Sequence, residues 1–350
     1  MNRNHGGKRL AHPDGIVDFS SNVCHLGPPR AALEAVRAAT AETVASYPDP
    51  DYPVLRAALS SYTGRPVEEI FPANGSAELF YLACNLLRPR RTLIISPSFC
   101  EYVLAATSSR SAVEEHLLLE DDGFALEPRR LAAQAREADL VFLCNPNSPT
   151  GVSHPLESVL AIARELKMGA VLLVDEAFIE FCDGPLERTA SRRPVDHIWV
   201  SRSLTKYFGL AGLRAGYLLA PRAAVRDLED SAPPWRINSL AEAAVVAALG
   251  DSKYVTRTTA LVAEARVTFI DMLERLGFLK VYPSEVNFLL VRIERPGLTS
   301  GELARKLLQQ GFLVRDASTF SGLDERYLRL AVRSTEDNLA LVRALEELEK

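Results

Sequence analysis

Short apolar runs alternate with amphipathic segments through the middle of the chain, and this alternation constrains the fold more than any other feature. It predicts buried strands at 92–97, 139–144, 171–175 and 196–201. A helix is predicted at 155–166, with Ser153 as its N-cap and Pro155 in its first turn. Strands that alternate with helices indicate an α/β domain with a mostly parallel sheet, in which ligands bind beyond the carboxyl ends of the strands.

The pattern changes after Trp235, where a long amphipathic region at about 240–277 is predicted to be helical. The remaining predicted elements are strands at 286–293, 311–315 and 327–332 and helices near 300–310 and from 335. They indicate a smaller α+β domain. The predicted units are an N-terminal segment (1–45) packing on the small domain and the active site, a large α/β domain (46–238) and a small domain (239–350).

The composition is typical of a globular enzyme: 350 residues, 47% hydrophobic and 24% charged, with a formal net charge of −5. Because the arginines are interspersed with carboxylates, we expect no nucleic-acid or membrane partner. No apolar run reaches the length of a membrane span, and the polar N-terminus lacks a signal-peptide pattern. Five scattered cysteines predict reduced thiols and a cytoplasmic location, and the six histidines lack metal-ligand spacing, so no metal site is expected.

A lysine stands just after the last strand predicted in the large domain, within the segment 201–214. A lysine at the end of a strand can form a Schiff base with an aldehyde cofactor. Ser203, Thr205 and Arg214 accompany Lys206, and two hydroxyls and a guanidinium suit the phosphate of such a cofactor. The combination predicts pyridoxal 5′-phosphate (PLP), whose ring acts as an electron sink. A lone lysine here would be typical of an exposed strand–loop–helix junction.

Two further segments could hold parts of this cofactor. Asp175 ends the most hydrophobic strand, and its carboxylate could pair with a protonated pyridine nitrogen, although such an aspartate is also typical of a helix N-cap. The segment 74–78 opens an apolar helix, where backbone N–H groups bind phosphate, Gly75 permits a tight turn and Ser76 adds a hydroxyl. The glycine-rich run 209–216 has the wrong spacing for a dinucleotide loop, so a nicotinamide enzyme is excluded.

Other residues could contact the ring or a substrate. An amide or hydroxyl in 145–151 could reach a ring hydroxyl, although a Pro/Gly turn is the simpler interpretation. Phe99 could stack on a ring or pack in the core. Arg315, Arg329 and Arg333 lie in or end apolar strands, which indicates either an anion pocket or surface ion pairs.

In their order along nearly the whole chain, these motifs resemble the fold-type I PLP-dependent enzymes of the class I/II aminotransferase superfamily. The matching segments are 47–50, 74–77, 145–151, 175–178, 203–214 and the C-terminal arginines. Within the superfamily the chain is similar to the group of threonine-phosphate decarboxylases and histidinol-phosphate aminotransferases. Segments 5–7, 18–22, 26–29 and 322–333, and Phe178 where aminotransferases usually have Tyr, favour the decarboxylases.

The resemblance implies a large domain with a mostly parallel central sheet, a smaller α+β C-terminal domain and a homodimer with shared active sites. It implies that Lys206 holds the cofactor covalently and moves protons, and that Asp175 pairs with the pyridine nitrogen. The residues implied in cofactor binding besides these two are Tyr47 (at the partner's phosphate), Gly75, Ser76, Ala77, Phe99, Asn147, Ser148, Phe178, Ser203, Thr205 and Arg214. The residues implied in substrate binding are His5, Asn22, Arg315, Arg329 and Arg333.

The sequence departs from the family pattern near the substrate. Cys24 and His25 replace a usual Asn-Pro, and Ser148 stands where an asparagine usually bonds the ring hydroxyl, with Asn147 as the alternative donor. The resemblance therefore implies decarboxylation of threonine phosphate, in a cobalamin-type pathway, or of a related phospho- or phosphonate amino acid. Transamination of the histidinol-phosphate type is the alternative. A non-catalytic PLP-fold binding or regulatory protein is a third, disfavoured because no DNA-binding element or basic patch is present.

Overall fold

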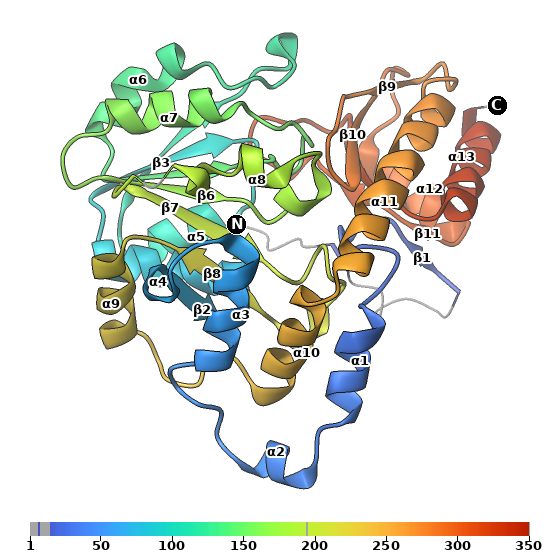
Figure 1. Cartoon of the computed structure of the whole chain (residues 1–350). Helices are drawn as coiled ribbons and strands as arrows, with labels where there is room; N and C mark the ends of the chain where they lie inside the picture. The colour runs from blue at the N-terminus through green and yellow to red at the C-terminus, as the bar shows by residue number, and fades with distance from the viewer. Residues whose placement is uncertain (1–5, 8–14, 194, 350) are drawn as a thin grey trace.

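The large domain is built on a seven-stranded sheet of order β2-β8-β7-β6-β5-β3-β4, covered by helices (Figure 1). The computed structural model describes residues 6–7, 15–193 and 195–349. The strands are β2 (Ile70–Ala73), β3 (Arg91–Ser96), β4 (Ala112–Leu117), β5 (Leu140–Cys144), β6 (Val171–Asp175), β7 (Ile198–Ser203) and β8 (Gly216–Leu219). Within this sheet only β8 runs antiparallel to its neighbours, so the predicted mostly parallel α/β fold is confirmed.

Two apolar cores cover the two faces of this sheet. Every residue of β5 and β6 is buried, which explains why their sequences are continuous apolar runs rather than alternating ones. One face packs on α4 (Ser76–Leu87), α5 (Glu101–Ser108) and α9 (Arg222–Ser231). The other packs on α3 (Pro53–Thr63), α6 (Pro128–Glu137), α7 (Leu156–Glu165) and α10 (Ser239–Leu249).

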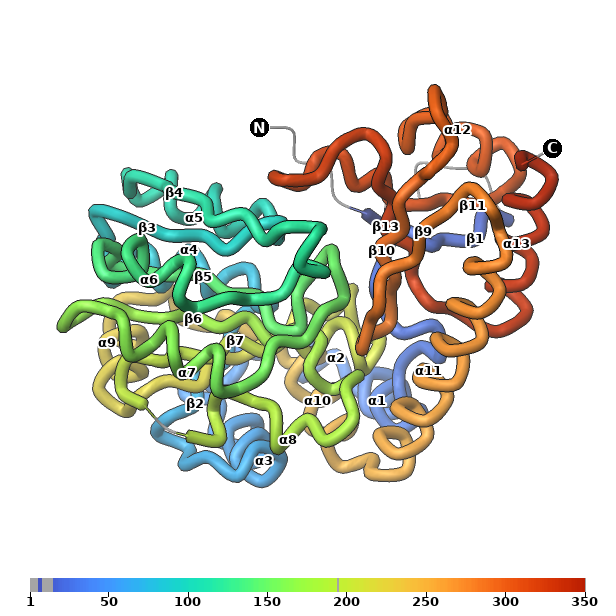
Figure 2. Tube along the Cα trace, turned by 90° about the horizontal axis from the view of Figure 1, so that it is seen from above, coloured from blue at the N-terminus to red at the C-terminus, as the bar shows by residue number. Residues whose placement is uncertain are grey.

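The small domain has its own four-stranded antiparallel sheet of order β12-β13-β10-β9. Its strands are β9 (Leu279–Val281), β10 (Phe288–Ile293), β12 (Arg315–Asp316) and β13 (Tyr327–Ala331), and its helices are α11 (Ser252–Leu273), α12 (Ser300–Gln309) and α13 (Thr335–Glu349). Near the N-terminus β1 (Val17–Asp18) pairs in parallel with β11 (Phe312–Leu313), so this segment lies against the small domain (Figure 2). The division of the chain at residues 45 and 238 stays a prediction.

Short elements connect these layers. They are α1 (Arg30–Arg37), α2 (Ala41–Ala45), α8 (Pro185–Arg188) and the 3₁₀ turns η2 (Val67–Glu69), η3 (Glu120–Asp122), η4 (Ile179–Phe181), η5 (Ala190–Arg192) and η6 (Ala211–Leu213). In the described part of the chain, no helix combines the length and apolarity that a bilayer crossing requires.

Two local predictions were wrong. Ser153 does not cap α7, because Pro155 occupies the N-cap position in an extended conformation and the helix begins at Leu156. The predicted helical region 240–277 is two helices, α10 and α11, because Asp251 caps a new helix by accepting a hydrogen bond from the backbone N–H of Tyr254.

Candidate active site

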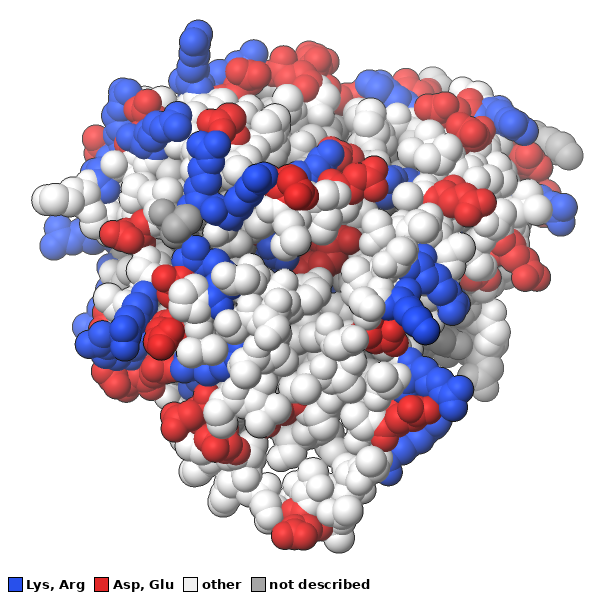
Figure 3. Space-filling view, in the orientation of Figure 1, with Lys and Arg blue, Asp and Glu red and all other residues white. Residues whose placement is uncertain are grey.

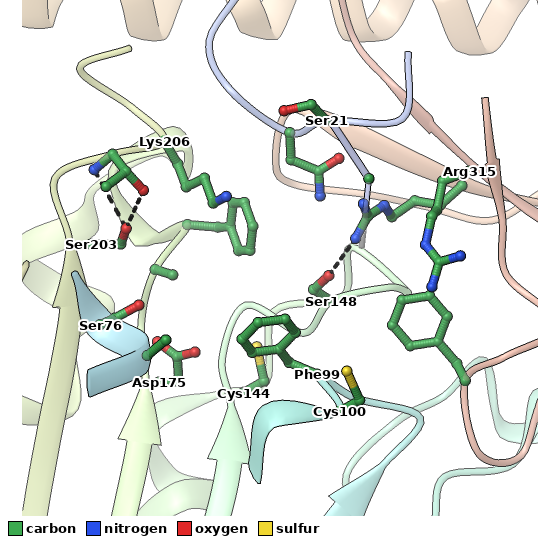
Figure 4. A pocket seen from close by; sticks show the side chains of 18 of the residues that line it. Ser21, Ser76, Phe99, Cys100, Cys144, Ser148, Asp175, Ser203, Lys206 and Arg315 are labelled. Carbon is green, nitrogen blue, oxygen red and sulfur yellow. Dashed lines mark hydrogen bonds between the residues drawn. The ribbon is translucent and has the colours of Figure 1, made fainter. Parts of the chain in front are cut away.

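A pocket opens beyond the carboxyl ends of β5, β6 and β7, where the two domains and the N-terminal segment meet (Figure 4). Parallel strands that end together bring residues distant in sequence to one edge. The large domain contributes Ser76, Ala77, Phe99, Cys100, Tyr102, Cys144, Ser148, Asp175, Ala177, Phe178, Ser203, Thr205, Lys206 and Arg214. The other segments contribute Gly6, Ser20, Ser21, Asn22, Arg315, Thr319, Phe320 and Arg329.

Lys206 projects its amine into the pocket from the loop that follows β7 (Figure 4). Burial lowers the pKa of this amine to about 8, and the positive charges of Arg329 and Arg214 act in the same direction, whereas Asp175 opposes them. A lysine with a lowered pKa is neutral in a larger fraction of molecules near neutral pH. Lys206 is therefore poised as a nucleophile toward a carbonyl carbon.

A cradle of hydroxyls and backbone lies beside Lys206. The hydroxyls of Ser203 and Thr205 are 2.7 Å apart and hydrogen-bonded, and Ser76 is the first residue of α4. Arg214 adopts φ +57°, and its Nη2 lies 2.5 Å from where a Cβ on Gly75 would stand. Gly75 itself has φ +80°, a backbone conformation that favours glycine. The cradle thus combines a helix N-terminus, hydroxyls and a guanidinium, the groups that bind a phosphate.

Asp175 ends β6 at the floor of the pocket and is held from both sides. Tyr102 donates to its Oδ2 at 2.6 Å, and Ser201 donates to its Oδ1 at 2.9 Å. Burial raises the pKa of Asp175, and the two hydroxyl donors oppose this shift by favouring the carboxylate. Sequence reasoning missed Tyr102, which lies in the first turn of α5, three residues after Phe99.

The residues predicted around a ring divide into two groups. Phe99, Phe178 and Ser148 line the pocket, and Phe99 meets Tyr102 edge-on with 5.9 Å between ring centroids. Asn147 does not line the pocket. Its amide donates at 3.0 Å to the carbonyl of Pro97 and to the hydroxyl of Thr150, so it holds the loop instead.

The end of the pocket opposite the cradle carries two buried arginines that have no carboxylate partner among the described residues. Arg329 donates at 3.0 Å to the Ser148 hydroxyl and to the backbone carbonyl of Ser20, while its Nε lacks a partner. Arg315 donates at 2.8 Å to the Thr319 hydroxyl and at 2.7 Å to a backbone carbonyl. Burial and the charge of Arg315 lower the pKa of Arg329 to about 9. Buried cations without counter-charges favour an anionic ligand.

The remaining predicted residues lie in different places. Asn22 lines the pocket with a buried side-chain oxygen that lacks a partner. Arg333 does not line it and instead donates to Asp337 at 3.0 Å. Tyr47 is 79% exposed and stacks on Trp235. His5 lies outside the described residues.

The pocket as a whole fits PLP. The cradle around Gly75, where the Arg214 guanidinium lies close to the backbone, would hold the phosphate, Asp175 the pyridine nitrogen, and Lys206 the aldehyde carbon. No group of three His, Cys, Asp or Glu side chains in the described ranges is arranged to hold a metal ion.

Comparisons with known proteins agree with this geometry. The family described as aminotransferase class I and II matches residues 14–345. The threonine-phosphate decarboxylase of Salmonella typhimurium is 36% identical over 338 residues, 96% of this chain and 92% of that protein. Histidinol-phosphate aminotransferase 2 of Archaeoglobus fulgidus is 33% identical, over 95% of this chain and 93% of that protein. The crystal structure of L-threonine-O-3-phosphate decarboxylase from Porphyromonas gingivalis superposes with a TM-score of 0.84 at 29% identity, covering 96% of this chain and all of that chain.

Proposed function

The chain belongs to the class I and II aminotransferase family, and from that premise we propose that it decarboxylates a phosphorylated amino acid. It is a PLP-dependent enzyme. The substrate class proposed is L-threonine O-3-phosphate or a related phospho- or phosphonate amino acid, as the likeness to the threonine-phosphate decarboxylase of Salmonella typhimurium suggests.

The observation that carries this proposal is the pair of buried arginines, Arg315 and Arg329, at the end of the pocket away from the cradle. Each donates only to neutral oxygens within the described residues. A phosphorylated amino acid brings two anionic groups, its carboxylate and its phosphate, so it can neutralise both guanidinia. An amino-alcohol phosphate without a carboxylate brings only one.

When bound, PLP supplies an electron sink for the bond that breaks at the substrate Cα. The protein decides which bond that is by orientation. Arg329 would hold the substrate carboxylate, and charge-assisted hydrogen bonds to arginine contribute roughly 1.5–3 kcal/mol, enough to fix a pose. Asp175, at the floor of the pocket, would keep a proton on the ring nitrogen, and Lys206 would hold or move the proton at Cα. The N-terminal residues Ser20 and Asn22 close the pocket from the other side.

Transamination is the alternative, supported by the likeness to the histidinol-phosphate aminotransferase of Archaeoglobus fulgidus. The same lysine and aspartate serve both reactions, and only the orientation of the substrate separates them. A non-catalytic PLP-fold protein is a weaker alternative, because Lys206, Asp175 and the cradle are all assembled.

We further propose a homodimer in which Tyr47 reaches the partner's cradle. The surface over α2, α3 and α10 is largely uncharged (Figure 3). The same region exposes large apolar side chains, with Val44 73% exposed and Val54 61% exposed. Exposed apolar surface of this kind is typical of an interface. A cytoplasmic location also stays a prediction, in keeping with five cysteines that form no disulfide within the described residues.

The proposal is tested by offering L-threonine O-3-phosphate to the PLP-loaded enzyme and measuring CO₂ without an added 2-oxo acid. Steady CO₂ release supports the decarboxylase. Amine transfer that requires a 2-oxo acid, with no CO₂, would establish the aminotransferase instead. A protein that stays colourless after addition of PLP would favour the non-catalytic alternative.

A further inference from the structure

One carboxylate of the large domain is surrounded by donors from the small domain. Glu120 begins η3, just after β4, and its side chain accepts hydrogen bonds from Lys280 at 2.9 Å, from Tyr327 at 2.6 Å and from Arg292 at 2.6 Å. Tyr282 donates to the same carboxylate. Burial opposes ionisation of Glu120, but these donors prevail and lower its pKa to about 2. The residue is therefore a fixed anion across the working pH range.

The donors to Glu120 form an ordered row on the small sheet. Lys280 on β9 pairs with Arg292 on β10, which pairs with Tyr327 on β13, so the three side chains share one face. Arg329 lies two residues beyond Tyr327 on the same strand, and side chains two apart in a strand point to the same face. Arg315 is the cross-strand partner of Arg329. The row held by Glu120 is thus adjacent to the row that carries both pocket arginines.

The two pocket arginines need such a restraint. Arg315 and Arg329 repel one another, since the charge of Arg315 lowers the pKa of Arg329, and no carboxylate of the described residues pairs with either. An unpaired buried cation gains hydration by moving toward water. In the absence of substrate, the repulsion between these two cross-strand partners therefore favours their separation unless other contacts hold the sheet in place.

We propose that Glu120 is a positioning residue, which holds this face of the small sheet against the large domain and so keeps Arg329 and Arg315 aimed into the pocket. The identity of the anion that the arginines bind rests on the function proposed above, whereas the restraint itself does not. Phe124, four residues after Glu120, strengthens the same junction by packing edge-on against Tyr282 with 5.3 Å between ring centroids.

The test compares Glu120→Gln with Glu294→Gln. Glu294 is the matched control, because it also accepts a hydrogen bond from Arg292, at 2.6 Å, but belongs to the small domain and links nothing across the junction. Glutamine preserves the shape of each side chain and removes its charge. Both variants are loaded with PLP, and kcat and KM are measured with L-threonine O-3-phosphate. Amide hydrogen exchange is followed in substrate-free samples.

Glu120→Gln should raise KM by about tenfold while kcat changes much less, because the anchoring of substrate anions is impaired before the chemistry is. Hydrogen exchange should become faster in 315–317 and 327–331 and stay unchanged in β6. Glu294→Gln should change neither KM nor hydrogen exchange in these segments. If Glu120→Gln fails to fold, Lys280→Met removes one donor from a side chain that is 47% exposed and should produce a smaller change in the same direction.

Two results would overturn the proposal: identical KM and exchange in the Glu120 and Glu294 variants, or a lower melting temperature of Glu120→Gln with an unchanged KM. The second result would mean that Glu120 only stabilises the fold. Because exchange is measured without substrate, faster exchange at 315–317 and 327–331 in a protein that does not act on threonine phosphate would refute the proposed function and leave the restraint standing.

Discussion

The two ends of the pocket are built in opposite ways. At the cofactor end, the ends of neighbouring strands of one sheet supply Asp175, Ser203 and Lys206, and their polar groups bond largely to one another or to nearby hydroxyls. At the substrate end, Arg315 and Arg329 come from the small domain and lack a carboxylate partner among the described residues. The first arrangement suits a resident group held in a rigid frame. The second leaves two positive charges without counter-charges, which an incoming anion can neutralise.

The largest expected effect lies at the cofactor end. Lys206→Ala should lower turnover by roughly 10³-fold or more, since the variant loses both the covalent link and the proton-transfer group. It should also lack the visible absorbance of the bound cofactor. Lys253→Ala, at an exposed position of α11, is the control and should behave as wild type. Retained turnover in Lys206→Ala would contradict the assignment.

Asp175→Asn should lower kcat by roughly 10²–10³-fold, because a neutral amide no longer stabilises charge on the ring nitrogen. Cofactor binding should survive, since the cradle and Lys206 are intact. Tyr102→Phe removes only one of the two hydroxyls that support the carboxylate and should cost about two- to tenfold in kcat. Wild-type rates in Asp175→Asn, measured at saturating substrate, are incompatible with its proposed role.

At the substrate end, Arg329→Met should raise KM by about ten- to hundredfold, with little loss of bound cofactor. Arg333→Met is the matched comparison, because Arg333 lies four residues further along the chain but is paired with Asp337 outside the pocket lining. Steady-state kinetics should separate the two variants clearly. Equal increases in KM would support the substrate-binding role predicted for Arg333 from the sequence.

The smallest effect is a shift in pH dependence. Because the amine of Lys206 has a pKa lowered to about 8, its neutral fraction rises as pH increases through that value. Capture of PLP by the cofactor-free protein should therefore accelerate with pH around a midpoint near 8, well below that of an ordinary lysine. Arg329→Met removes a positive charge that lowers the lysine pKa, so its midpoint should move to higher pH. Stopped-flow absorbance measures both.

The same contrast explains what the sequence could predict. Strand β6 was predicted with its observed bounds and located Asp175 at its end, and the next predicted strand located Lys206, because a strand end is a local feature. The partners of these residues were harder to find. The hydrogen bond from Tyr102 to Asp175 joins residues 73 positions apart in the sequence, and the hydrogen bond from Tyr327 to Glu120 joins residues 207 positions apart. Such contacts depend on how the layers pack, and no periodicity in the sequence encodes them.

The sequence also did not predict two backbone features, the direction of strand β8 and the conformation of Arg214. The antiparallel strand β8 lies between β2 and β7 and completes the sheet through its pairing with both, yet its short sequence carries no sign of direction. Arg214 occupies a left-handed conformation that favours glycine, and it does so beside Gly75 in the cradle. The segment 201–214 predicted that Arg214 binds phosphate, but it did not predict this strained backbone conformation.

The central claim is that PLP is held covalently by one lysine at the edge of the large sheet. It is tested most directly by reducing the PLP-loaded protein with borohydride, digesting it and locating the pyridoxyl group by mass spectrometry. The account predicts a single labelled site, at Lys206. A label at another lysine, or none at all in a protein that has bound the cofactor, would contradict it.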